Sequence, residues 1–206
     1  MEPTKTTYNA LLLLGPTGAG KTPFGDFLAM RGLRAVRCHH FDFGAHLRRI
    51  GTDAWRPTLL DDSDITTVKN ALTSGALLED HQFHIARHIL CSFATDRRIK
   101  TGDLIALNGL PRHAGQARDI ADLVQVQTLV YLRCTAETVY QRIQTDAGGD
   151  RGARRDDQME LVRKKLETFA ERTAPLLAYY SEQGAKIINV EVGLATQPQD
   201  IYDLLG

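Results

Sequence analysis

The stretch that decides the fold is Ala10-Leu11-Leu12-Leu13-Leu14-Gly15-Pro16-Thr17-Gly18-Ala19-Gly20-Lys21-Thr22. Its apolar first part is a short run of the kind that forms a buried strand. Its second part, from Gly15 to Thr22, matches G-x-x-x-x-G-K-[ST], the pattern of a phosphate-binding P-loop. Apolar residues then recur at helical spacing. Because a P-loop lies between a strand and a helix, this context supports the motif and predicts a nucleoside triphosphate site.

The residue types of the loop suit phosphate chemistry. Glycines let backbone N–H groups turn inward around phosphate oxygens, and the helix that begins near Gly20 adds the positive end of its dipole. We predict that Lys21 reaches the β- and γ-phosphates as a catalytic residue and that the Thr22 hydroxyl binds Mg²⁺. The loop residues predicted to bind the nucleotide are Gly15, Thr17, Gly18, Ala19, Gly20, Lys21 and Thr22.

The rest of the chain alternates short apolar runs with helical patterns. Besides Ala10–Leu14, strands are expected at Leu104–Leu107, Leu129–Leu132 and Ile187–Val190, with a weaker one at Ala35–Cys38. A long apolar stripe from Met159 to Tyr180 predicts a helix that Pro175 bends or splits near Thr173–Ala174. Strands that alternate with helices predict an α/β fold in three layers, with a five-stranded parallel sheet, in a single domain over residues 1–206.

Composition limits the partners and the compartment. The 25 Lys and Arg residues balance the 25 Asp and Glu residues, so no bulk field favours nucleic acid or an anionic membrane. The three cysteines are far apart and odd in number, which fits a reducing cytosol better than a disulfide framework. The longest clean apolar run is too short for a signal peptide or a membrane span. We therefore expect a cytoplasmic monomer whose partners are small molecules.

Several later segments resemble the adenylate kinase family, in the right order and at similar separations. Asn108-Gly109-Leu110-Pro111-Arg112, with Gln116 four residues on, resembles D-G-[FY]-P-R-x-x-x-Q. Arg154-Arg155-Asp156-Asp157 resembles the R-x-D-D at the end of the family's lid, and Val162–Tyr180 resembles its long closing helix. Further matches to the acceptor side are Gly44, Leu47 and Arg48 in one helix and the segment Gly75–Leu78.

The resemblance implies a P-loop kinase that transfers the γ-phosphate of ATP, with Mg²⁺, to a nucleoside monophosphate, AMP first. It implies an acceptor-binding insert at about 42–78 and a short lid at about 145–152. It also implies that Arg112, Arg154 and Lys165 are catalytic together with Lys21, and that Arg142 packs on the donor adenine. The residues expected to bind the acceptor are Asp42, Gly44, Arg48, Leu78, Gly109, Arg112 and Gln116.

The acceptor side also departs from the family pattern. Asn108 stands where the family usually has an aspartate near the Mg²⁺ waters, and Phe43 and Ala45 replace a threonine and an aspartate. Lys165 replaces an arginine of the closing helix. Asp42 follows the second strand, where it could contact the metal or its waters, act as a general base, or simply cap the helix Gly44–Ile50.

These departures leave two other functions open. An aspartate after the second strand resembles shikimate-kinase-like enzymes, so a kinase that phosphorylates a hydroxyl metabolite with Asp42 as base is one alternative. A nucleotide-binding protein with little catalysis is the other. No structural zinc is expected, because the short lid lacks cysteine and histidine. His81, His84 and His88 share a helix face that we interpret as a polar surface, since no carboxylate partner is obvious.

Overall fold

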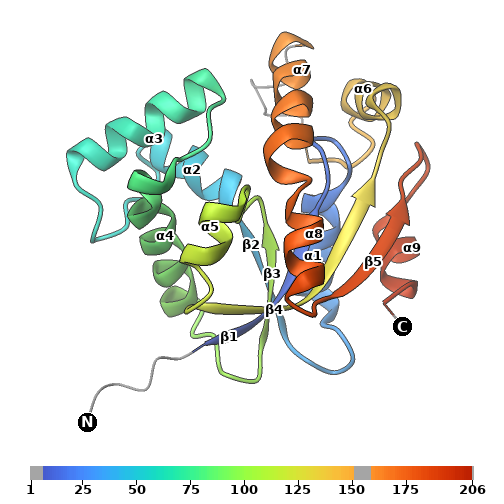
Figure 1. Ribbon diagram of the computed structural model, residues 1–206, viewed down its shortest axis with the longest axis horizontal. Helices are drawn as coiled ribbons and strands as arrows, with labels where there is room; N and C mark the ends of the chain where they lie inside the picture. The colour runs from blue at the N-terminus through green and yellow to red at the C-terminus, as the bar shows by residue number, and fades with distance from the viewer. Residues whose placement is uncertain (1–6, 151–158, 206) are drawn as a thin grey trace.

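A parallel sheet forms the middle layer of the computed structural model, which describes residues 7–150 and 159–205 (Figure 1). The strands of the described part are β1 (Tyr8–Leu14), β2 (Cys38–Asp42), β3 (Leu104–Asn108), β4 (Val124–Arg133) and β5 (Lys186–Glu191). Every neighbouring pair is parallel, and the order across the sheet is β2-β3-β1-β4-β5. Consequently the loops that follow β1, β2 and β3 leave the sheet side by side at one edge.

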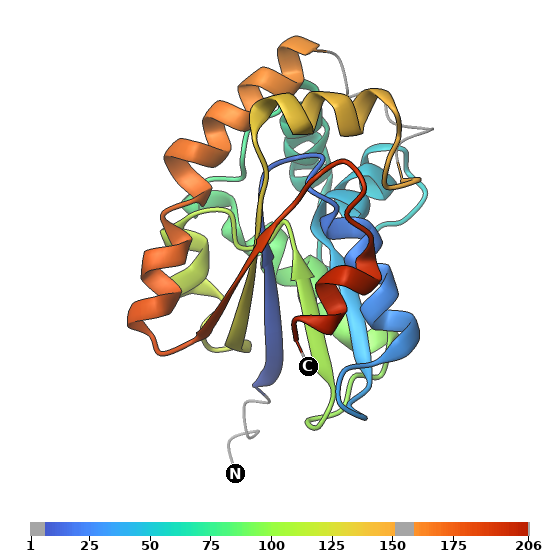
Figure 2. The same ribbon diagram turned by 90° about the vertical axis from the view of Figure 1, so that its right-hand side faces the viewer.

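Helices cover both faces of this sheet (Figures 1 and 2). The described helices are α1 (Lys21–Arg31), α2 (Phe43–Gly51), α3 (Asp62–Ser74), α4 (Phe83–Asp96), α5 (Ala114–Asp119), α6 (Ala136–Gln144), α7 (Met159–Thr168), α8 (Leu176–Glu182) and α9 (Pro198–Asp203). Side chains of α1 and α9 bury one face, and side chains of α4, α5 and α8 bury the other. The predicted three-layer α/β fold is confirmed.

The central strand β1 shows why the layers form. Leu11 and Leu13 pack on Phe24 and Leu28 of α1, while Leu12, next to them on the strand, faces the opposite cluster. These side chains are at most 2% exposed. A strand that is covered on both faces reads as a continuous apolar run, which is what the sequence shows. The P-loop thus directly follows a strand that is buried on both faces.

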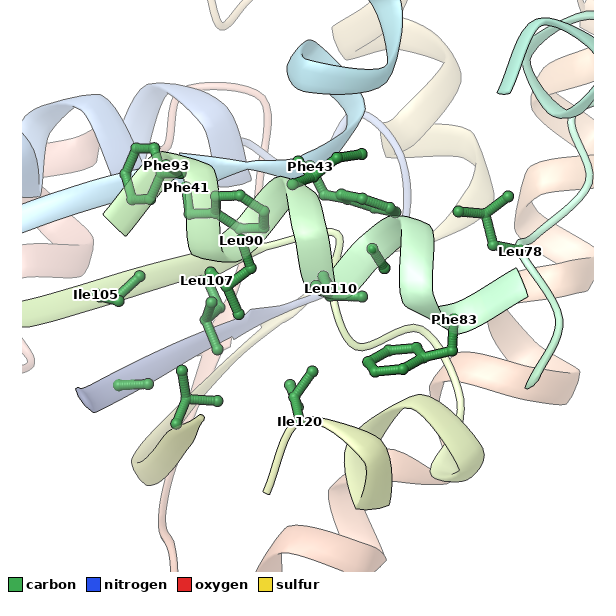
Figure 3. Close-up of a cluster of buried hydrophobic side chains, with 14 of the residues drawn as sticks. Phe41, Phe43, Leu78, Phe83, Leu90, Phe93, Ile105, Leu107, Leu110 and Ile120 are labelled. Carbon is green, nitrogen blue, oxygen red and sulfur yellow. The ribbon is translucent and has the colours of Figure 1, made fainter. Parts of the chain in front are cut away.

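An aromatic cluster joins β2 to α2 and α4 (Figure 3). Phe41 is fully buried, and its ring centroid lies 6.1 Å from that of Phe43 and 5.1 Å from that of Phe93. His46 stacks on Phe41 with centroids 5.1 Å apart, and burial lowers the pKa of this imidazole to about 4. These contacts fix the end of β2, from which the candidate site residues project.

One predicted strand was wrong in its position. The strand expected at Ala35–Cys38 lies at Cys38–Asp42 instead. Arg34 and Ala35 adopt left-handed φ angles of 48° and 65°, so the chain turns there and pairs with β3 only from Cys38 onward. Asp42 is therefore the last residue of β2 rather than a residue that follows it. The other four predicted strands are confirmed.

The interruption expected near Pro175 is confirmed. After α7 the chain forms a π-helical turn at Phe169–Thr173, and α8 begins directly after Pro175. The Thr173 hydroxyl donates a hydrogen bond of 2.8 Å to the carbonyl oxygen of Arg112. The break thus attaches the closing helix to the loop after β3.

Two predicted segments flank the edge of the sheet where the loops leave it. Residues 42–78, expected as the acceptor-binding insert, contain α2 and α3. Residues 145–152, expected as the lid, begin directly after α6, and their last two residues lie outside the described part. No helix among the described residues combines the length and the apolar character that a bilayer span would need.

We predict that Phe41→Ala lowers the free energy of unfolding by about 3–5 kcal/mol, because it empties a fully buried aromatic site. Urea denaturation followed by circular dichroism measures this. Met30→Ala is the control, since Met30 is 80% exposed and its truncation should change stability by less than about 0.5 kcal/mol. Equal effects of the two substitutions would contradict the assigned core.

Candidate nucleotide and phosphate-acceptor site

A cavity of about 200 Å³ lies at the carboxyl ends of β1, β2 and β3. Its lining combines the P-loop, the start of α2, the loop after β3 and the α7 region. The predicted site residues that line it are Gly15, Thr17, Gly18, Gly20, Lys21, Thr22, Asp42, Gly44, Arg48, Gly109, Arg112 and Lys165. One cavity therefore brings together residues predicted to bind the donor and residues predicted to bind the acceptor.

The P-loop has the backbone conformation that its glycines allow. Gly18 and Gly20 have φ angles of 79° and 91°, in the left-handed region where a side chain would cause strain. Gly20 is the N-cap of α1, so the helix begins at the loop and directs its N–H groups toward the cavity. The Lys21 ammonium folds back and donates to the carbonyl oxygens of Gly15 and Pro16 at 2.7 and 2.6 Å.

Three polar side chains from three elements meet beside the P-loop. The Thr22 hydroxyl of α1 donates to Oδ2 of Asp42 at 2.7 Å. Nδ2 of Asn108, at the end of β3, lies 3.1 Å from both that carboxylate oxygen and the Thr22 hydroxyl. Asp42 and Asn108 are partners in the parallel register of β2 and β3. A carboxylate therefore lies next to the predicted metal-binding hydroxyl, although the aspartate of the family motif is absent.

The two oxygens of Asp42 have different surroundings. Oδ1 accepts the backbone N–H of Ala45 at 2.8 Å and so caps α2, whereas Oδ2 faces Thr22 and Asn108. Burial by itself would raise the pKa of Asp42. Hydrogen bonds from Thr22 and Ala45, with the nearby His40 and Arg48, outweigh burial and hold that pKa below its usual value. Asp42 is thus both a helix cap and an ionised group at the cavity.

The loop after β3 brings Arg112 into the lining of the cavity. The Leu110–Pro111 peptide bond is cis, and the Arg112 N–H donates to Oε1 of Gln116 at 2.8 Å. Burial lowers the pKa of the Arg112 guanidinium to about 10. No hydrogen bond or ion pair joins this guanidinium to another residue of the described part. A partly desolvated cation that lines a cavity and is paired with no protein anion among the described residues is suited to bind an external anion.

Two of the residues expected to bind the acceptor, Leu78 and Gln116, are not in the lining of this cavity. Gln116 is 1% exposed, and its amide is engaged by the Arg112 N–H and by the Leu78 carbonyl oxygen, the latter at 2.8 Å. Leu78 is 3% exposed and belongs to the hydrophobic core (Figure 3). Four apolar side chains line the cavity instead, namely Leu47, Ala71, Leu72 and Phe169. Sequence analysis singled out neither Ala71 nor Leu72.

Arg142 is buried behind the P-loop, outside the described lining of the large cavity. Its Nε donates to the Gly18 carbonyl oxygen at 3.1 Å, and its Nη1 donates to the carbonyl oxygens of Gly193 and Leu194 at 2.6 and 3.1 Å. It also lines a second cavity of about 110 Å³, together with Gly20, Pro23, Gly148 and residues 196–198. Ala19 lines this second cavity as well.

The remaining predictions concern other parts of the chain. Arg154, expected as a catalytic residue, lies outside the described residues. Within the described ranges, no group of three or more His, Cys, Asp or Glu side chains is arranged to hold a metal ion. His84 does have a carboxylate partner that sequence analysis missed, because its Nε2 lies 2.7 Å from Oδ1 of Asp64 on α3.

Comparison with known proteins agrees with the resemblance. No protein-family model matches the chain. Among curated relatives, the adenylate kinase of Agrobacterium fabrum is 31% identical over 84% of this chain and 85% of its own. Those of Treponema denticola and Bartonella tribocorum are 25% and 27% identical, and they cover 90% and 95% of this chain and 93% and 99% of their own.

We predict that Asn108→Asp destabilises the protein near neutral pH by about 1–3 kcal/mol, because it places a second carboxylate beside Asp42. The repulsion raises the folded-state pKa of one of the two carboxyls above its unfolded value. The penalty should therefore be small at about pH 4 and grow as the pH rises through the raised pKa. Chemical denaturation at several pH values measures it.

The double variant provides the control for this prediction. Asparagine caps a helix about as well as aspartate, so Asp42→Asn preserves the α2 cap while it removes the charge. In that background Asn108→Asp should cost little at any pH. A penalty that persists there would show that the two side chains do not interact.

Proposed function

The chain belongs to the adenylate kinase family, and from that premise we propose that it transfers the γ-phosphate of ATP to AMP, which yields two ADP. One observation carries the proposal: the P-loop and Arg112 both line a single cavity. Phosphoryl transfer requires that donor and acceptor phosphates meet among cations with little covalent help from the protein. The cations that line this cavity support such a transfer.

The donor phosphates would bind at the P-loop. The N–H groups at the start of α1 and the Lys21 ammonium would surround the β- and γ-phosphates, and Lys21 would exchange its present contacts with loop carbonyls for phosphate oxygens. Negative charge shifts during transfer, so a cation at this position lowers the barrier most in the transition state.

Magnesium fits the oxygen atoms next to the P-loop. Mg²⁺ prefers hard oxygen ligands and usually keeps several waters, with one or two protein ligands besides phosphate. Thr22 Oγ1 and Asp42 Oδ2 lie 2.7 Å apart at the cavity and satisfy that preference. We assign Thr22 as the ligand and Asp42 as the carboxylate that orients the hydroxyl and the metal-bound waters. Mg²⁺ held there would neutralise negative charge on the phosphate oxygens during transfer.

The acceptor phosphate would bind Arg112. Guanidinium groups grip phosphate oxygens through two parallel hydrogen bonds, and Arg112 offers its donors to the cavity. Arg48 and Lys165 line the same space and add positive charge, while Gly44 and Gly109 leave room for the acceptor. For the acceptor base, Leu78 and Gln116 remain candidates only if Gln116 gives up its present backbone hydrogen bonds.

The donor adenine would occupy the second cavity. Arg142 lines it while its Nε and Nη1 hold the P-loop to the loop after β5, so a flat base could pack against the guanidinium. Arg154 belongs to the same proposal as a lid residue that approaches the phosphates during catalysis. The lid would also exclude water and so limit hydrolysis of ATP.

Asp42 bears on the alternative of a hydroxyl acceptor. A general base works best with a pKa near the working pH. The pKa of Asp42 is instead lowered, and both of its oxygens accept hydrogen bonds from the protein. These properties favour a metal-orienting role over proton abstraction from an alcohol, and they support a phosphate acceptor.

The proposed function is tested by an acceptor panel. ADP formation from Mg²⁺ and ATP should be fastest with AMP, slower with GMP, CMP and UMP, and negligible with polyols such as shikimate. The Lys21→Ala variant serves as the control for contaminating kinases and should be slower by orders of magnitude. Stimulation by a polyol alone would establish the hydroxyl kinase, and no stimulation by any acceptor would establish a binding protein with little catalysis.

We predict that Arg112→Ala raises the KM for AMP by about 10- to 100-fold, the loss expected for hydrogen bonds between charged groups. The KM for ATP should change little, because the P-loop contacts remain. Steady-state kinetics with each substrate varied in turn measures both values. Arg118→Ala is the matched control, since it removes an exposed arginine from α5. A larger effect on ATP than on AMP would reverse the assignment of the two sides.

A further inference from the structure

A row of side chains leads from the surface of α1 to the amide of Asn108. His40, on β2, lies between them: its Nδ1 is 2.8 Å from Oδ1 of Asp26, and its Nε2 is 3.3 Å from Nδ2 of Asn108. The His40 side chain is only 6% exposed, whereas that of Asp26 is 69% exposed. Neither His40 nor Asp26 is among the described residues that line the cavity. This histidine therefore reaches the candidate site through Asn108.

The two carboxylates fix the direction of the hydrogen bonds in this row. Ionised Asp42 can only accept, so the Asn108 atom 3.1 Å from its Oδ2 is the amide nitrogen. Asp26 likewise accepts from Nδ1 of His40, so Nδ1 carries a proton. Nε2 faces the donor nitrogen of Asn108, so Nε2 is the acceptor and carries a lone pair. That lone pair accepts the second N–H of Asn108. The Asn108 carbonyl oxygen then points away from Asp42.

The position of the His40 ring depends on a glycine in the middle of α1. A Cβ atom on Gly25 would collide with the imidazole of His40. Glycine in a helix interior costs about 1 kcal/mol relative to alanine. Gly25 thus lowers the stability of α1 but leaves room for the His40 ring, which packs against it.

Asn108 requires such support more than an aspartate would. A carboxylate presents two equivalent acceptor oxygens, but an amide has one acceptor end and one donor end. Metal-bound waters donate hydrogen bonds, so only the carbonyl end of Asn108 can serve them. No hydrogen bond joins Oδ1 of Asn108 to another residue in the described ranges, and Asn108 lines the cavity. An amide turned the other way would present its N–H groups to the waters and its carbonyl oxygen to the Asp42 carboxylate, and neither contact is a hydrogen bond that these partners can make.

We propose that His40, anchored by Asp26, is a positioning residue that keeps the carbonyl oxygen of Asn108 available to Mg²⁺-bound ATP. The proposal rests on the proposed function in one respect, namely that the bound ligand is ATP with Mg²⁺. It does not depend on which molecule accepts the phosphate. Residues that orient groups around a metal typically change metal affinity or activity by 10- to 100-fold. A second carboxylate at the position of Asn108 would attract the metal-bound waters by its charge. His40 and Asp26 would make up for part of that attraction, because they keep the Asn108 carbonyl oxygen turned toward the waters.

The test measures ATP binding by isothermal titration calorimetry with and without Mg²⁺, so it needs no acceptor and no turnover. His40→Phe keeps the ring but removes both nitrogens. It should reduce the Mg²⁺-dependent gain in ATP affinity by about 10-fold and leave Mg²⁺-free binding unchanged. His40→Gln, whose side-chain oxygen can still accept from Asn108, should restore the gain to within about 3-fold of the parent.

Asp26→Ala tests the anchor from the protein surface, where truncation leaves the fold intact. It should reduce the Mg²⁺-dependent gain in ATP affinity, but by less than His40→Phe does. The control is Glu182→Ala, which removes an exposed carboxylate from α8 and should leave this gain unchanged. In an Asn108→Ala background, His40→Phe should lose its effect, because no amide remains to be oriented.

The alternatives give different results. Equal losses with and without Mg²⁺, or a Gln variant as poor as the Phe variant, would overturn the positioning role. An effect of His40→Phe that persists in Asn108→Ala would overturn the route through Asn108. Failure of the proposed function appears elsewhere, as normal Mg²⁺-dependent ATP binding without ADP formation from AMP.

Discussion

The parallel pairing of β1, β3 and β2 is the constraint on which the candidate site depends. Parallel strands end at one edge, so the P-loop after β1, Asn108 at the end of β3 and Asp42 at the end of β2 are neighbours there. The register pairs Asp42 with Asn108 directly. Because β1 is buried on both faces, it cannot shift without loss of the core, and the P-loop keeps its position relative to both side chains.

Local sequence patterns predicted the features that depend on few neighbours in the chain. The P-loop, four strands and the break near Pro175 follow from glycine placement, apolar runs and the geometry of proline. The second strand was misplaced because His39 and His40 look polar, although His39 is buried against Asp103 at 2.9 Å. Such a partner lies far away in the sequence, so no local pattern reveals that a strand can bury a histidine.

In the candidate site, too, sequence patterns identified residues but not the contacts that these residues make with distant partners. Sequence analysis found Asp42 but could not choose between a helix cap and a contact near the metal-binding hydroxyl, because both depend on where each oxygen points. In the structure, Oδ1 accepts the hydrogen bond that caps α2, and Oδ2 accepts hydrogen bonds from Thr22 and Asn108. The contacts of Gln116 with the backbone were also beyond sequence analysis, since the family motif fixes the residue and not its hydrogen bonds.

The charges around the cavity explain why Asn108 and Asp42 belong together. Two carboxylates 3.1 Å apart could not both ionise cheaply, so an aspartate at one of these positions favours a neutral residue at the other. The chain as a whole has no net charge, yet Lys21, Arg48, Arg112 and Lys165 all line one cavity. A second ionised carboxylate at the end of β3 would offset part of that positive potential where phosphates are expected to bind. With Asn108 neutral, Asp42 both caps α2 and offers one carboxylate oxygen beside Thr22, and the positive potential of the four cations is offset less than it would be by a second carboxylate at the end of β3.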